Sequence, residues 1–393
     1  MTHRPGKPTM TTTNGQAILD WLASQRPAML ALLEELVNTD SGSYDKPGVD
    51  AVGERIRGFL DRHGIVHDTV ANDRFGDVVR AHVGQGANTS ILLMGHRDTV
   101  FPKGEAGRRR FRIENGRAYG PGVADMKAGL VMNAFVLAAF QKFGGAPAPL
   151  VGLFTSDEEI GSPTSRPVIE AEARRARVVF NSEPGRPSGA VVTGRKGGVF
   201  MKCEVTGKAA HSGGNFEQGI SAIEELARKI IALHALTDIP KGTTLNVGLI
   251  SGGQTVNTVA PSAECQIDLR YVAPPDRAAA MEKIERIVAA SHVPGTSAKV
   301  EILGEFLPLV QNAESKRLFQ HYASCAKKVG LNVSGEFTGG CADSGFAAAV
   351  GATTLCGTGP VGGKAHTAEE YLEVDSMVPR AQSLALAVMR LEQ

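Results

Sequence analysis

ILLMGHRDTV, residues 91–100, is the stretch that decides the fold, because an apolar run ends abruptly in a polar loop. Short apolar runs bounded by polar residues are typical of buried strands that lead into functional loops. LVGLFTSDEEIGS, residues 150–162, and VVFNSEP, residues 178–184, repeat the pattern. In open α/β sheets, sites lie at the carboxyl ends of such strands. We therefore expect the acidic and imidazole side chains of these loops to gather at one edge of a sheet.

Two histidines and four carboxylates share this context, each in a loop punctuated by glycine or proline: His96, Asp125, Glu158, Glu159, Glu183 and His366. Histidine and carboxylate side chains in this number are what a pair of divalent metal ions requires. The set carries the argument, because each member has an ordinary structural reading when it is taken alone.

Those ordinary readings stay open at this stage. His96 and Asp98 fit a metal-ligating histidine oriented by a carboxylate and, equally, a surface pair. Asp125 precedes a predicted helix, where capping is the commoner role of aspartate. Residues 157–159 fit acids that stabilise a helix N-terminus, although three adjacent acids at a strand end repel one another unless a cation intervenes. A lone histidine such as His366 is usually structural.

Composition is that of an ordinary globular protein, with 393 residues, 42% hydrophobic and 21% charged. This length predicts two or more domains. The net charge of +1 gives no field that would attract nucleic acid or an anionic membrane, so we expect neither partner. The run of arginines at residues 108–110 fits a solvated turn or an anion contact.

The five cysteines are few, odd in number and widely spaced, and they include no CxxC pair. This usage favours a reducing compartment, and we expect a cytoplasmic protein. Residues 1–15 are polar and lack the apolar core of a secretory signal, so we expect a disordered tail there. No apolar stretch reaches the ~18 residues that span a membrane.

Helical periodicity alternates with short apolar strands in the first half of the chain, which predicts an α/β fold with a mixed, mostly parallel sheet covered by helices. The expected helices lie at 16–38 (divided near Pro27), 49–63, 126–143 and 163–175, and the expected strands at 65–70, 77–83, 90–95, 149–155 and 177–182.

From about residue 194 the order changes to β-α-β-β-α-β, which is the ferredoxin-like arrangement. Its expected strands lie at 197–206, 243–250, 262–272 and 297–303, and its helices at 219–236 and 276–291. The α/β pattern then resumes, with helices at 312–329, 343–350 and 374–391 and a strand at 352–356. We therefore predict a domain at 194–304 inserted into a catalytic domain made of 16–193 and 305–393.

Nine motifs, in order along the chain, resemble those of the di-zinc aminoacyl exopeptidase family: HRDTV, YGPGVADMKAG, SDEEIGS, SEP, TGKAAHSG, NTVAPSAE, DLRY, TGGCADS and AHTAEEYLEV. That family holds glutamate carboxypeptidase, acetylornithine deacetylase, succinyl-diaminopimelate desuccinylase, aminoacylase and the tripeptidases. The resemblance runs from about residue 50 to 390 and is strongest to glutamate carboxypeptidase. It is very specific for the family and weakly specific for the substrate.

The resemblance implies two divalent metal ions, zinc in the first place, with manganese or cobalt as substitutes. His96, Asp125 and Glu183 would hold one ion. Asp125 would bridge to the other ion, which Glu159 and His366 would complete.

By the same resemblance, Glu158 would be the general base, and Asp98 would orient His96 from the second ring nitrogen. A cis peptide bond is expected between Asp125 and Met126.

The inserted domain would resemble the lid and dimerisation domain of the family, and we expect a homodimer. His211 would enter the active site of the partner subunit and polarise the scissile carbonyl group. Asn257 and Arg270 would bind substrate, although a strand-edge ion pair also explains Arg270. Arg195 and Lys196 lie near the domain boundary, where a contact with a substrate carboxylate and a salt bridge are equally compatible.

One segment departs from the family pattern. Chains like glutamate carboxypeptidase carry an arginine at the exit of the lid, where it is thought to read a C-terminal glutamate, but here LGEFLPLVQ has Glu305. This puts acidic specificity in doubt, and Phe306 or Leu307 favours a more apolar substrate. The role of Asp343, in TGGCADS, stays open.

The expected reaction is metal-dependent hydrolysis of an amide bond in a small molecule, either a peptide that loses its C-terminal amino acid or an N-acyl amino acid. One alternative is an N-deacylase or a hydrolase of another small aromatic or conjugated amide. A non-catalytic metal-binding member of the family is another, but all five ligands and the base are present. No GxGxxG or Walker pattern follows a strand, which argues against a nucleotide-binding protein.

Overall fold

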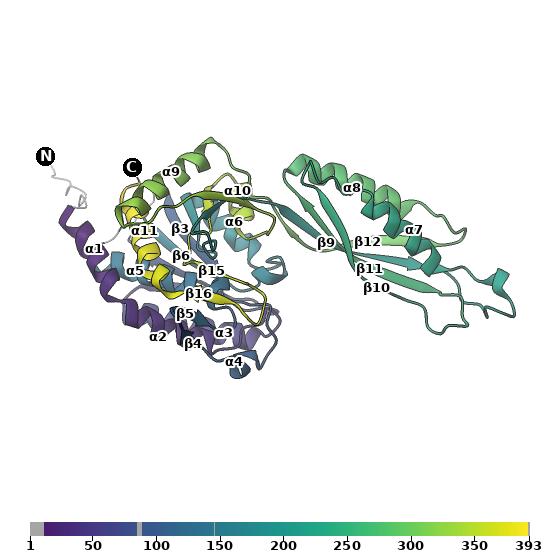
Figure 1. The fold of residues 1–393 in the computed structure, drawn as a ribbon, viewed down its shortest axis with the longest axis horizontal. Helices are drawn as coiled ribbons and strands as arrows, with labels where there is room; N and C mark the ends of the chain where they lie inside the picture. The colour runs from purple at the N-terminus through teal and green to yellow at the C-terminus, as the bar shows by residue number, and fades with distance from the viewer. Residues whose placement is uncertain (1–11, 85–88, 145, 392–393) are drawn as a thin grey trace. The chain divides into compact units, whose positions relative to one another are not determined.

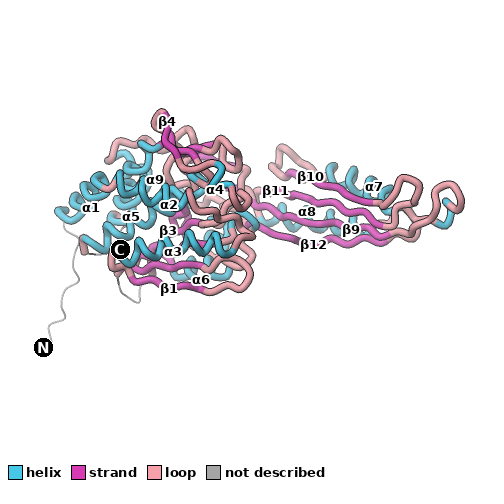
Figure 2. Tube along the Cα trace, turned by 90° about the horizontal axis from the view of Figure 1, so that it is seen from below, coloured by secondary structure: helices cyan, strands magenta, loops and turns pink. Residues whose placement is uncertain are grey.

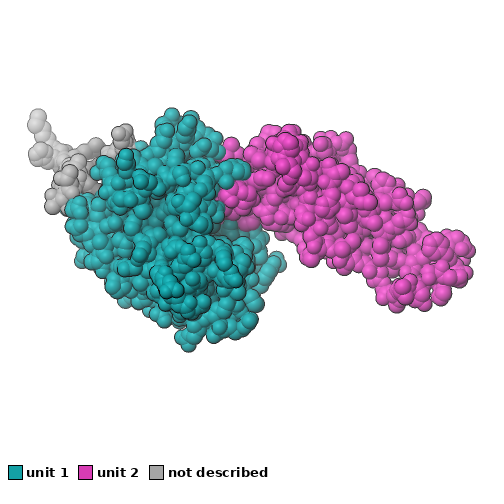
Figure 3. Space-filling model, viewed as in Figure 1, with its two compact units in different colours: residues 1–194, 311–337, 346–393 teal, residues 195–310, 338–345 magenta. Residues whose placement is uncertain are grey.

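The computed structural model describes residues 12–84, 89–144 and 146–391, which form two compact units (Figure 3). Unit 1 comprises residues 1–194, 311–337 and 346–393, and unit 2 comprises 195–310 and 338–345. The segment 338–345 lies in unit 2, whereas its sequence placed it in the catalytic domain. The Arg195 side chain holds it there, since it donates to the carbonyl groups of Gly340 and Cys341.

Unit 1 is built from helices packed on a large sheet (Figure 1). Its helices are α1 (Thr12–Ser24), α2 (Arg26–Val37), α3 (Lys46–Arg62), α4 (Glu105–Arg108), α5 (Ala128–Lys142), α6 (Arg166–Arg175), α9 (Ala313–Lys328) and α11 (Met377–Met389). Short helical turns are η1 (Val123–Lys127), η2 (Glu158–Ile160) and η4 (Val374–Ser376), and α10 (Ser344–Ala349) crosses the boundary between the units.

The large sheet has eight strands in the order β1-β2-β6-β3-β7-β14-β8-β13. They are β1 (Val66–Val70), β2 (Val78–Val83), β3 (Ser90–His96), β6 (Leu150–Thr155), β7 (Ala176–Asn181), β8 (Val191–Arg195), β13 (Gly335–Thr338) and β14 (Thr353–Cys356). β6, β3, β7 and β14 are parallel, while β1 and β2 pair antiparallel with their neighbours and β8 pairs antiparallel with β14. The mixed α/β class is confirmed, with these four parallel strands at the centre of the sheet.

The parallel strands are buried from end to end, which is why their sequences are unbroken apolar runs. Residues 123–142, which span η1 and α5, are long and apolar enough to cross a membrane by length and composition alone, but 94% of the stretch is buried inside the protein. This helix therefore packs in the core of unit 1, where it fixes the turn η1 at its start.

A second, smaller sheet in unit 1 has the order β15-β16-β5-β4. Its strands are β4 (Arg112–Glu114), β5 (Arg117–Tyr119), β15 (Gly362–Gly363) and β16 (Tyr371–Glu373). The sequence did not predict this sheet or strands β8 and β13. Its strands have two or three residues each and β4 is wholly exposed, so no apolar alternation marks them.

Unit 2 has the predicted β-α-β-β-α-β order. Its elements are β9 (Gly197–Thr206), η3 (Phe216–Gln218), α7 (Ala222–His234), β10 (Thr244–Gly252), β11 (Ser262–Tyr271), α8 (Pro274–Ala289) and β12 (Ser297–Phe306). The sheet is antiparallel in the order β10-β11-β9-β12, and Figures 1 and 2 show both helices on one of its faces. β10 and β12 are the edge strands.

The predicted disordered tail lies mostly outside the described residues, since the structure describes the chain only from residue 12. For residues 12–15 the prediction is wrong, because they form the first turn of α1. The Asn14 side chain donates to the carbonyl oxygen of Phe143, 3.4 Å away, and so ties this turn to the end of α5.

Candidate metal centre

His96 is the last residue of the central strand β3 and is buried, with 1% of its surface exposed. Its Nδ1 atom lies 3.0 Å from the carbonyl oxygen of Asp98 and 3.4 Å from the Asp98 carboxylate. Asp98 is also buried, so the reading of these residues as a surface pair is wrong. Nε2 of His96 is left to face the interior of the site.

Asp125 lies in the turn η1, between β5 and the buried helix α5. Its Oδ1 atom is 3.3 Å from Nε2 of His96, and its Oδ2 atom is 3.4 Å from Nε2 of His366. One carboxylate therefore offers one oxygen to each imidazole, and it does not cap the helix. The peptide bond between Asp125 and Met126 is cis, as the resemblance implies.

Residues 157–159 follow β6 and divide into two roles. Asp157 accepts hydrogen bonds from the backbone N–H groups of Thr164 and Ser165, just before α6, so it serves the helix N-terminus. Glu158 and Glu159 belong to η2, and their backbone N–H groups donate to the Asp98 carboxylate at 3.1 and 3.0 Å. The Asp98 carboxylate therefore positions both η2 and the ring of His96.

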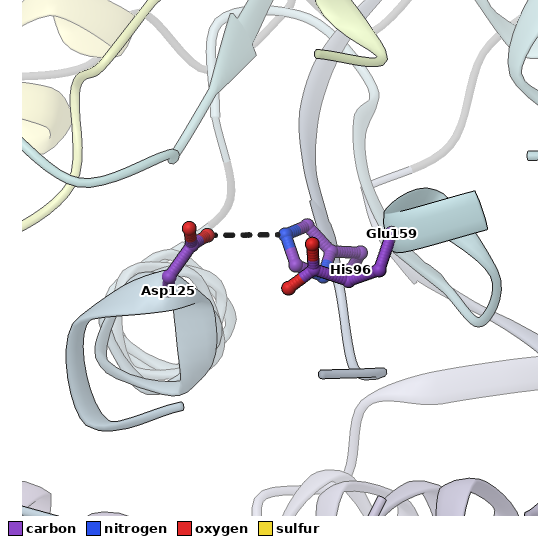
Figure 4. Close-up of side chains that lie close together, drawn as sticks. All are labelled: His96, Asp125 and Glu159. Carbon is purple, nitrogen blue, oxygen red and sulfur yellow. Dashed lines mark ion pairs between the residues drawn. The ribbon is translucent and has the colours of Figure 1, made fainter. Parts of the chain in front are cut away.

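The remaining carboxylates complete two groups around His96. Glu158 and Glu183 bring carboxylate oxygens to 3.8 and 3.7 Å from Nε2 of His96. Ligand atoms of these three residues lie within 4.8 Å of one another, and so do those of His96, Asp125 and Glu159. Figure 4 shows the second group converging from a strand end, a helical turn and η2. By distance alone, Glu158 is therefore close enough to His96 to serve as a metal ligand.

His366 lies in the loop between β15 and β16, with its backbone in the left-handed region at φ +64°. Its Nε2 atom is 3.1 Å from Glu159 and 3.4 Å from Asp125. Its side chain is 54% exposed, whereas the other residues of the cluster are buried or nearly so. Unit 1 thus brings His96, Asp125, Glu158, Glu159, Glu183 and His366 into one cluster.

The charges of the cluster perturb its imidazoles strongly. Hydrogen bonds that His366 donates to Asp125 and Glu159 raise its pKa to about 10. Burial disfavours a charged His96, but Glu158, Asp125 and Asp98 outweigh this and raise its pKa well above the ordinary value. The surrounding carboxylates therefore favour a positive charge at each of the two imidazoles.

The pKa values of the two carboxylates beside His366, Glu159 and Asp125, are shifted in opposite directions. Burial raises the pKa of Glu159 to about 7, against the hydrogen bond from His366. Burial would also raise the pKa of Asp125, but the neighbouring imidazoles of His366 and His96 outweigh it and hold that pKa below the ordinary range. Strong perturbation in opposite directions within one cluster is typical of functional sites.

The donor set fits divalent metal ions. Nε2 of His96 is buried and makes no hydrogen bond with the described residues, although carboxylate oxygens surround it. A buried polar atom without a partner is costly, and a cation among imidazole and carboxylate ligands removes that cost. The structure thus brings together two groups of possible ligands, His96 with Asp125 and Glu159 and His96 with Glu158 and Glu183, and His366 lies beside the first group.

The predicted substrate residues all lie in unit 2, where they form two groups. His211 and Asn257 lie together, since the N–H group of Ser212 donates to the carbonyl oxygen of Asn257 and His211 is bridged to Thr258. Both side chains are exposed. Nδ1 of His211 accepts hydrogen bonds from the N–H groups of Gly213 and Gly214, so Nε2 is the ring nitrogen that faces outward.

Arg270, Arg195 and Lys196 form the second group, near the start of β9. Arg270 donates twice to Asp268, lies over the ring of Phe200 and contacts the Cys341 sulfur at 2.8 Å. Arg195 is buried and holds residues 340 and 341. The backbone N–H of Lys196 donates to Thr338.

The two groups lie at opposite ends of the unit 2 sheet. In the antiparallel register of β9 and β11, Gly198 pairs with Arg270 and Thr206 pairs with Ser262. His211 follows the end of β9 at Thr206, and Asn257 precedes the start of β11 at Ser262. At about 3.3 Å per residue, the groups are roughly 30 Å apart.

Several buried charged residues escaped the sequence analysis, and two of them, Glu370 and Arg97, contact the segments that carry the cluster. Glu370 accepts three backbone N–H groups of the Asp125 turn. Arg97 lies between His96 and Asp98 and donates to the carbonyl groups of Val49, Asp77 and Thr155. The available signal was their position inside the HRDTV and AHTAEEYLEV motifs, but only the structure shows that their partners are backbone groups.

A search against family models matches residues 92–390 to the model described as peptidase family M20/M25/M40. The matched range contains every residue of the metal cluster. The chain belongs to the M20 family. It is therefore a metallohydrolase of peptides or N-acyl amino acids that uses divalent metal ions. The family predicted from the nine motifs is confirmed.

Curated relatives within the M20 family point to two reactions. Carboxypeptidase G2 of Pseudomonas sp. (strain RS-16) is 30% identical over 375 residues, covering 93% of this chain and 90% of the relative. Acetylornithine deacetylase of Myxococcus xanthus is 29% identical over 296 residues, covering 70% and 76%.

Solved structures share the fold at lower identity. The M20 metallo-carboxypeptidase Sso-CP2 from Sulfolobus solfataricus superposes with a TM-score of 0.76 at 19% identity, covering 92% of this chain and 99% of that one. The dipeptidase Dug1p from Saccharomyces cerevisiae gives 0.74 at 15% identity, covering 96% and 98%. At these identities the likeness establishes the fold alone.

Proposed function

We propose that this protein hydrolyses the amide bond of a peptide's C-terminal amino acid or of an N-acyl amino acid, with Glu158 as the general base. The observation that carries the proposal is Asp125, which offers one carboxylate oxygen to each of the two imidazoles. A carboxylate shared in this way between two ligand groups is the arrangement that a two-metal hydrolase requires. Zinc is the proposed native metal, because imidazole and carboxylate ligands suit it.

The ligand groups would be His96, Asp125 and Glu183 for one ion and Asp125, Glu159 and His366 for the other. When bound, the ions supply Lewis acidity and lower the pKa of the attacking water. Asp98 keeps the ring of His96 oriented from Nδ1, as outer carboxylates do in metal sites.

Glu158 is the carboxylate proposed to move the proton. It is buried beside His96, and Asp98 fixes its backbone, so its side chain is held within the cluster. As base it takes a proton from the attacking water, and as acid it delivers that proton to the nitrogen of the leaving amine. No other residue needs to change its protonation state in this scheme.

His211 is proposed to stabilise the oxyanion from a second copy of the chain. Its Nε2 atom faces outward, and it lies roughly 30 Å from the Arg270 group by strand length. Two groups so far apart in one chain serve the same small substrate only when they come from different subunits. Asn257 lies with His211 and is proposed to act with it, whereas Arg270 binds substrate from its own chain.

A homodimer through unit 2 is therefore part of the proposal. Edge strand β10 exposes Leu249 and Ile250, each 62% exposed, and the adjacent helix α7 exposes Ile223 and Ile231. An unpaired edge strand beside exposed apolar side chains is a surface that native proteins cover. We call this surface the α7–β10 edge.

Substrate side-chain preference is proposed to be apolar rather than acidic. At the position where the resemblance expects an arginine, Glu305 forms an ion pair with Arg277, so the local charge is already balanced. Phe306 is buried and its ring packs edge-on against that of Phe200, so its ring is not the recognition element. The acetylornithine deacetylase relatives keep N-deacylation as the second candidate.

A cytoplasmic location is proposed from the cysteines. All five are free thiols in the structure, including Cys203 and Cys265, which lie opposite each other on β9 and β11. Opposed thiols that stay reduced are what a reducing compartment maintains.

Hydrolysis of an amide panel by zinc- and manganese-loaded protein, with a chelator control, tests the proposal. The panel holds N-acyl amino acids, folyl- and benzoyl-glutamate, dipeptides and aromatic amides. Chelator-sensitive release of an amino acid is expected, with apolar side chains preferred over glutamate. Metal binding without turnover of any member would contradict it, and preference for glutamate would contradict the specificity.

A further inference from the structure

Glu370 is a fully buried carboxylate whose partners are all backbone groups of one turn. Its Oε1 atom accepts the N–H groups of Ala124 and Asp125 at 2.8 and 2.9 Å, and its Oε2 atom accepts that of Gly122 at 3.0 Å. These N–H groups precede α5, where the helix leaves donors unpaired and favours negative charge. The carboxylate thus satisfies three donors of the turn that carries Asp125.

The same residue ends the loop that carries His366. The N–H of Glu370 donates to the carbonyl of Thr367, and the N–H of Thr367 donates to that of Lys364. These two successive turns enclose His366, whose left-handed backbone is uncommon for a residue other than glycine. Glu370 is therefore the point where the His366 loop is attached to the Asp125 turn.

The amide of glutamine cannot replace the two acceptor oxygens of Glu370. Glutamine has one acceptor oxygen and one NH₂ donor, so at least one N–H of the turn would face another donor. A buried donor left without a partner is unfavourable, and the turn can relieve this only by moving. Movement of the turn displaces the carboxylate of Asp125 from both imidazoles.

We infer that Glu370 is a positioning residue that sets the Asp125 turn and the His366 loop in their metal-binding arrangement before any metal arrives. It touches neither substrate nor metal, and it acts through the backbone of Asp125. The inference rests on the proposed function in one respect, since it assigns Asp125 and His366 to the second ligand group.

Adjacent Glu369 supplies a matched control. It lies in the same loop, its side chain is 71% exposed, and it pairs with Lys364 at the surface. Glu369→Gln and Glu370→Gln make the same chemical change one residue apart. A general effect of charge near the site would appear in both variants, whereas a positioning effect appears only in Glu370→Gln.

Metal affinity is the first readout, measured by zinc titration of metal-free protein in a chelator-buffered series. The wild type is expected to bind two ions per chain. Glu370→Gln is expected to weaken the second ion roughly 10- to 100-fold, as loss of an outer-shell partner does, and Glu369→Gln to bind like the wild type. Added zinc should restore turnover of Glu370→Gln, because positioning rather than chemistry is lost. Equal zinc affinities in the two variants would overturn the inference.

Hydrogen exchange in metal-free wild-type protein is the second readout and needs no variant, so it decides the inference even if Glu370→Gln does not fold. The amides of Gly122, Ala124 and Asp125 are expected to be protected without metal. Rapid exchange that slows only after zinc is added would show that the metal orders the turn, and the inference would fail. If the wild type binds fewer than two ions while these amides are protected, the two-metal proposal fails and the positioning role of Glu370 stands.

Discussion

Glu158 and Glu159 are adjacent in the chain, yet their side chains have different neighbours. Glu159 lies 3.1 Å from His366, on the side of the cluster where Asp125 presents Oδ2. Glu158 lies on the opposite side, beside His96 and Glu183. Because neighbouring side chains of η2 point in different directions, one loop supplies both the proposed ligand and the proposed base.

Glu158→Gln is expected to keep its metal and lose turnover, because glutamine fills the same space but transfers no proton. The loss in kcat should be about 10²–10⁴-fold, the usual size of a general acid–base contribution. Metal content by atomic absorption and kcat on the best panel substrate provide the check.

Glu159→Gln is the comparison, and it should lose metal as well as turnover. If Glu158→Gln also loses metal, then Glu158 is a ligand, as its distance from His96 permits. Near-wild-type turnover with metal retained would remove Glu158 from the chemistry altogether.

The positions of the cluster could be predicted because each follows an apolar strand or opens a glycine-rich loop, and such loops meet at a sheet edge. Arg97 and Glu370 could not be predicted, since a charged residue bound to backbone carbonyl or N–H groups leaves no partner in the sequence. The exposure of His366 could not be predicted either, because it depends on the packing of its loop.

Helix α3 passes close to the site through Gly53. A methyl group at Gly53 would lie 2.0 Å from Nη1 of Arg97. Arg97 cannot withdraw easily, because three carbonyl groups hold its guanidinium and 1% of the residue is exposed. The glycine therefore lets the helix approach the arginine that separates two site residues.

Gly53→Ala is expected to destabilise the protein by about 1–3 kcal/mol, the usual cost of overpacking. Gly58→Ala, in the same helix, puts its methyl group 3.6 Å from Arg62, an ordinary contact, and should stabilise by up to ~1 kcal/mol through helix propensity. Urea unfolding of both variants measures the change in the free energy of unfolding and its sign. Equal effects would mean that Arg97 moves aside.

Helix α7 holds a buried ion pair, Glu225 with Lys229, in the interior of unit 2. Lys229 donates to the carbonyl groups of Ile287 and Val288 at the end of α8, and Glu225 accepts the N–H groups of His292 and Val293. The pair thereby ties α7 to α8 and to the turn that follows α8.

Glu225→Gln is expected to cost about 3–5 kcal/mol near neutral pH, because it leaves Lys229 buried without its counter-charge. Burial opposes the charge of Glu225, but the bonds from Lys229, Val293 and His292 outweigh it and lower its pKa below 4.5. A lowered folded pKa gives stability that is present above pH 4.5 and lost as pH falls through that folded pKa. The difference from wild type should therefore shrink in acid.

Urea unfolding across a pH series tests this expectation, with Glu224→Gln as the control. Glu224 pairs with Arg228 on the exposed side of the same helix, so its loss should cost at most ~1 kcal/mol. A Glu225→Gln effect that stays constant down to the acid limit would mean that the charge of Glu225 is not what stabilises the unit.

At the scale of the whole molecule, the α7–β10 edge predicts the oligomeric state. Ile250→Lys places a charge in the middle of the proposed interface and should convert a dimer to a monomer, as edge lysines do. Ile302→Lys, on the opposite edge strand β12, changes the same residue type at a similar exposure and should leave the dimer intact. Sedimentation velocity distinguishes the two, and a dimeric Ile250→Lys would place the interface elsewhere.

Mixed dimers test whether His211 acts across that interface. His211→Ala and Glu158→Gln should each be inactive, but co-expression should recover about a quarter of wild-type activity, since half of a random mixture is heterodimer with one intact site. Without recovery, His211 acts within its own chain or not at all.

The interleaving of the two units has a consequence for the order of synthesis. Unit 2 has all four strands of its sheet once the chain reaches residue 306, and then lacks only residues 307–310 and 338–345. At that point unit 1 still lacks β14, which pairs with β7. Pairing across so long a sequence separation is intrinsically slow. The apolar helix α5 lacks its partner α11 during that interval. A nascent chain therefore exposes the apolar helix α5 until α11 emerges, and it gains His366, the last of the proposed ligands, shortly before that exposure ends.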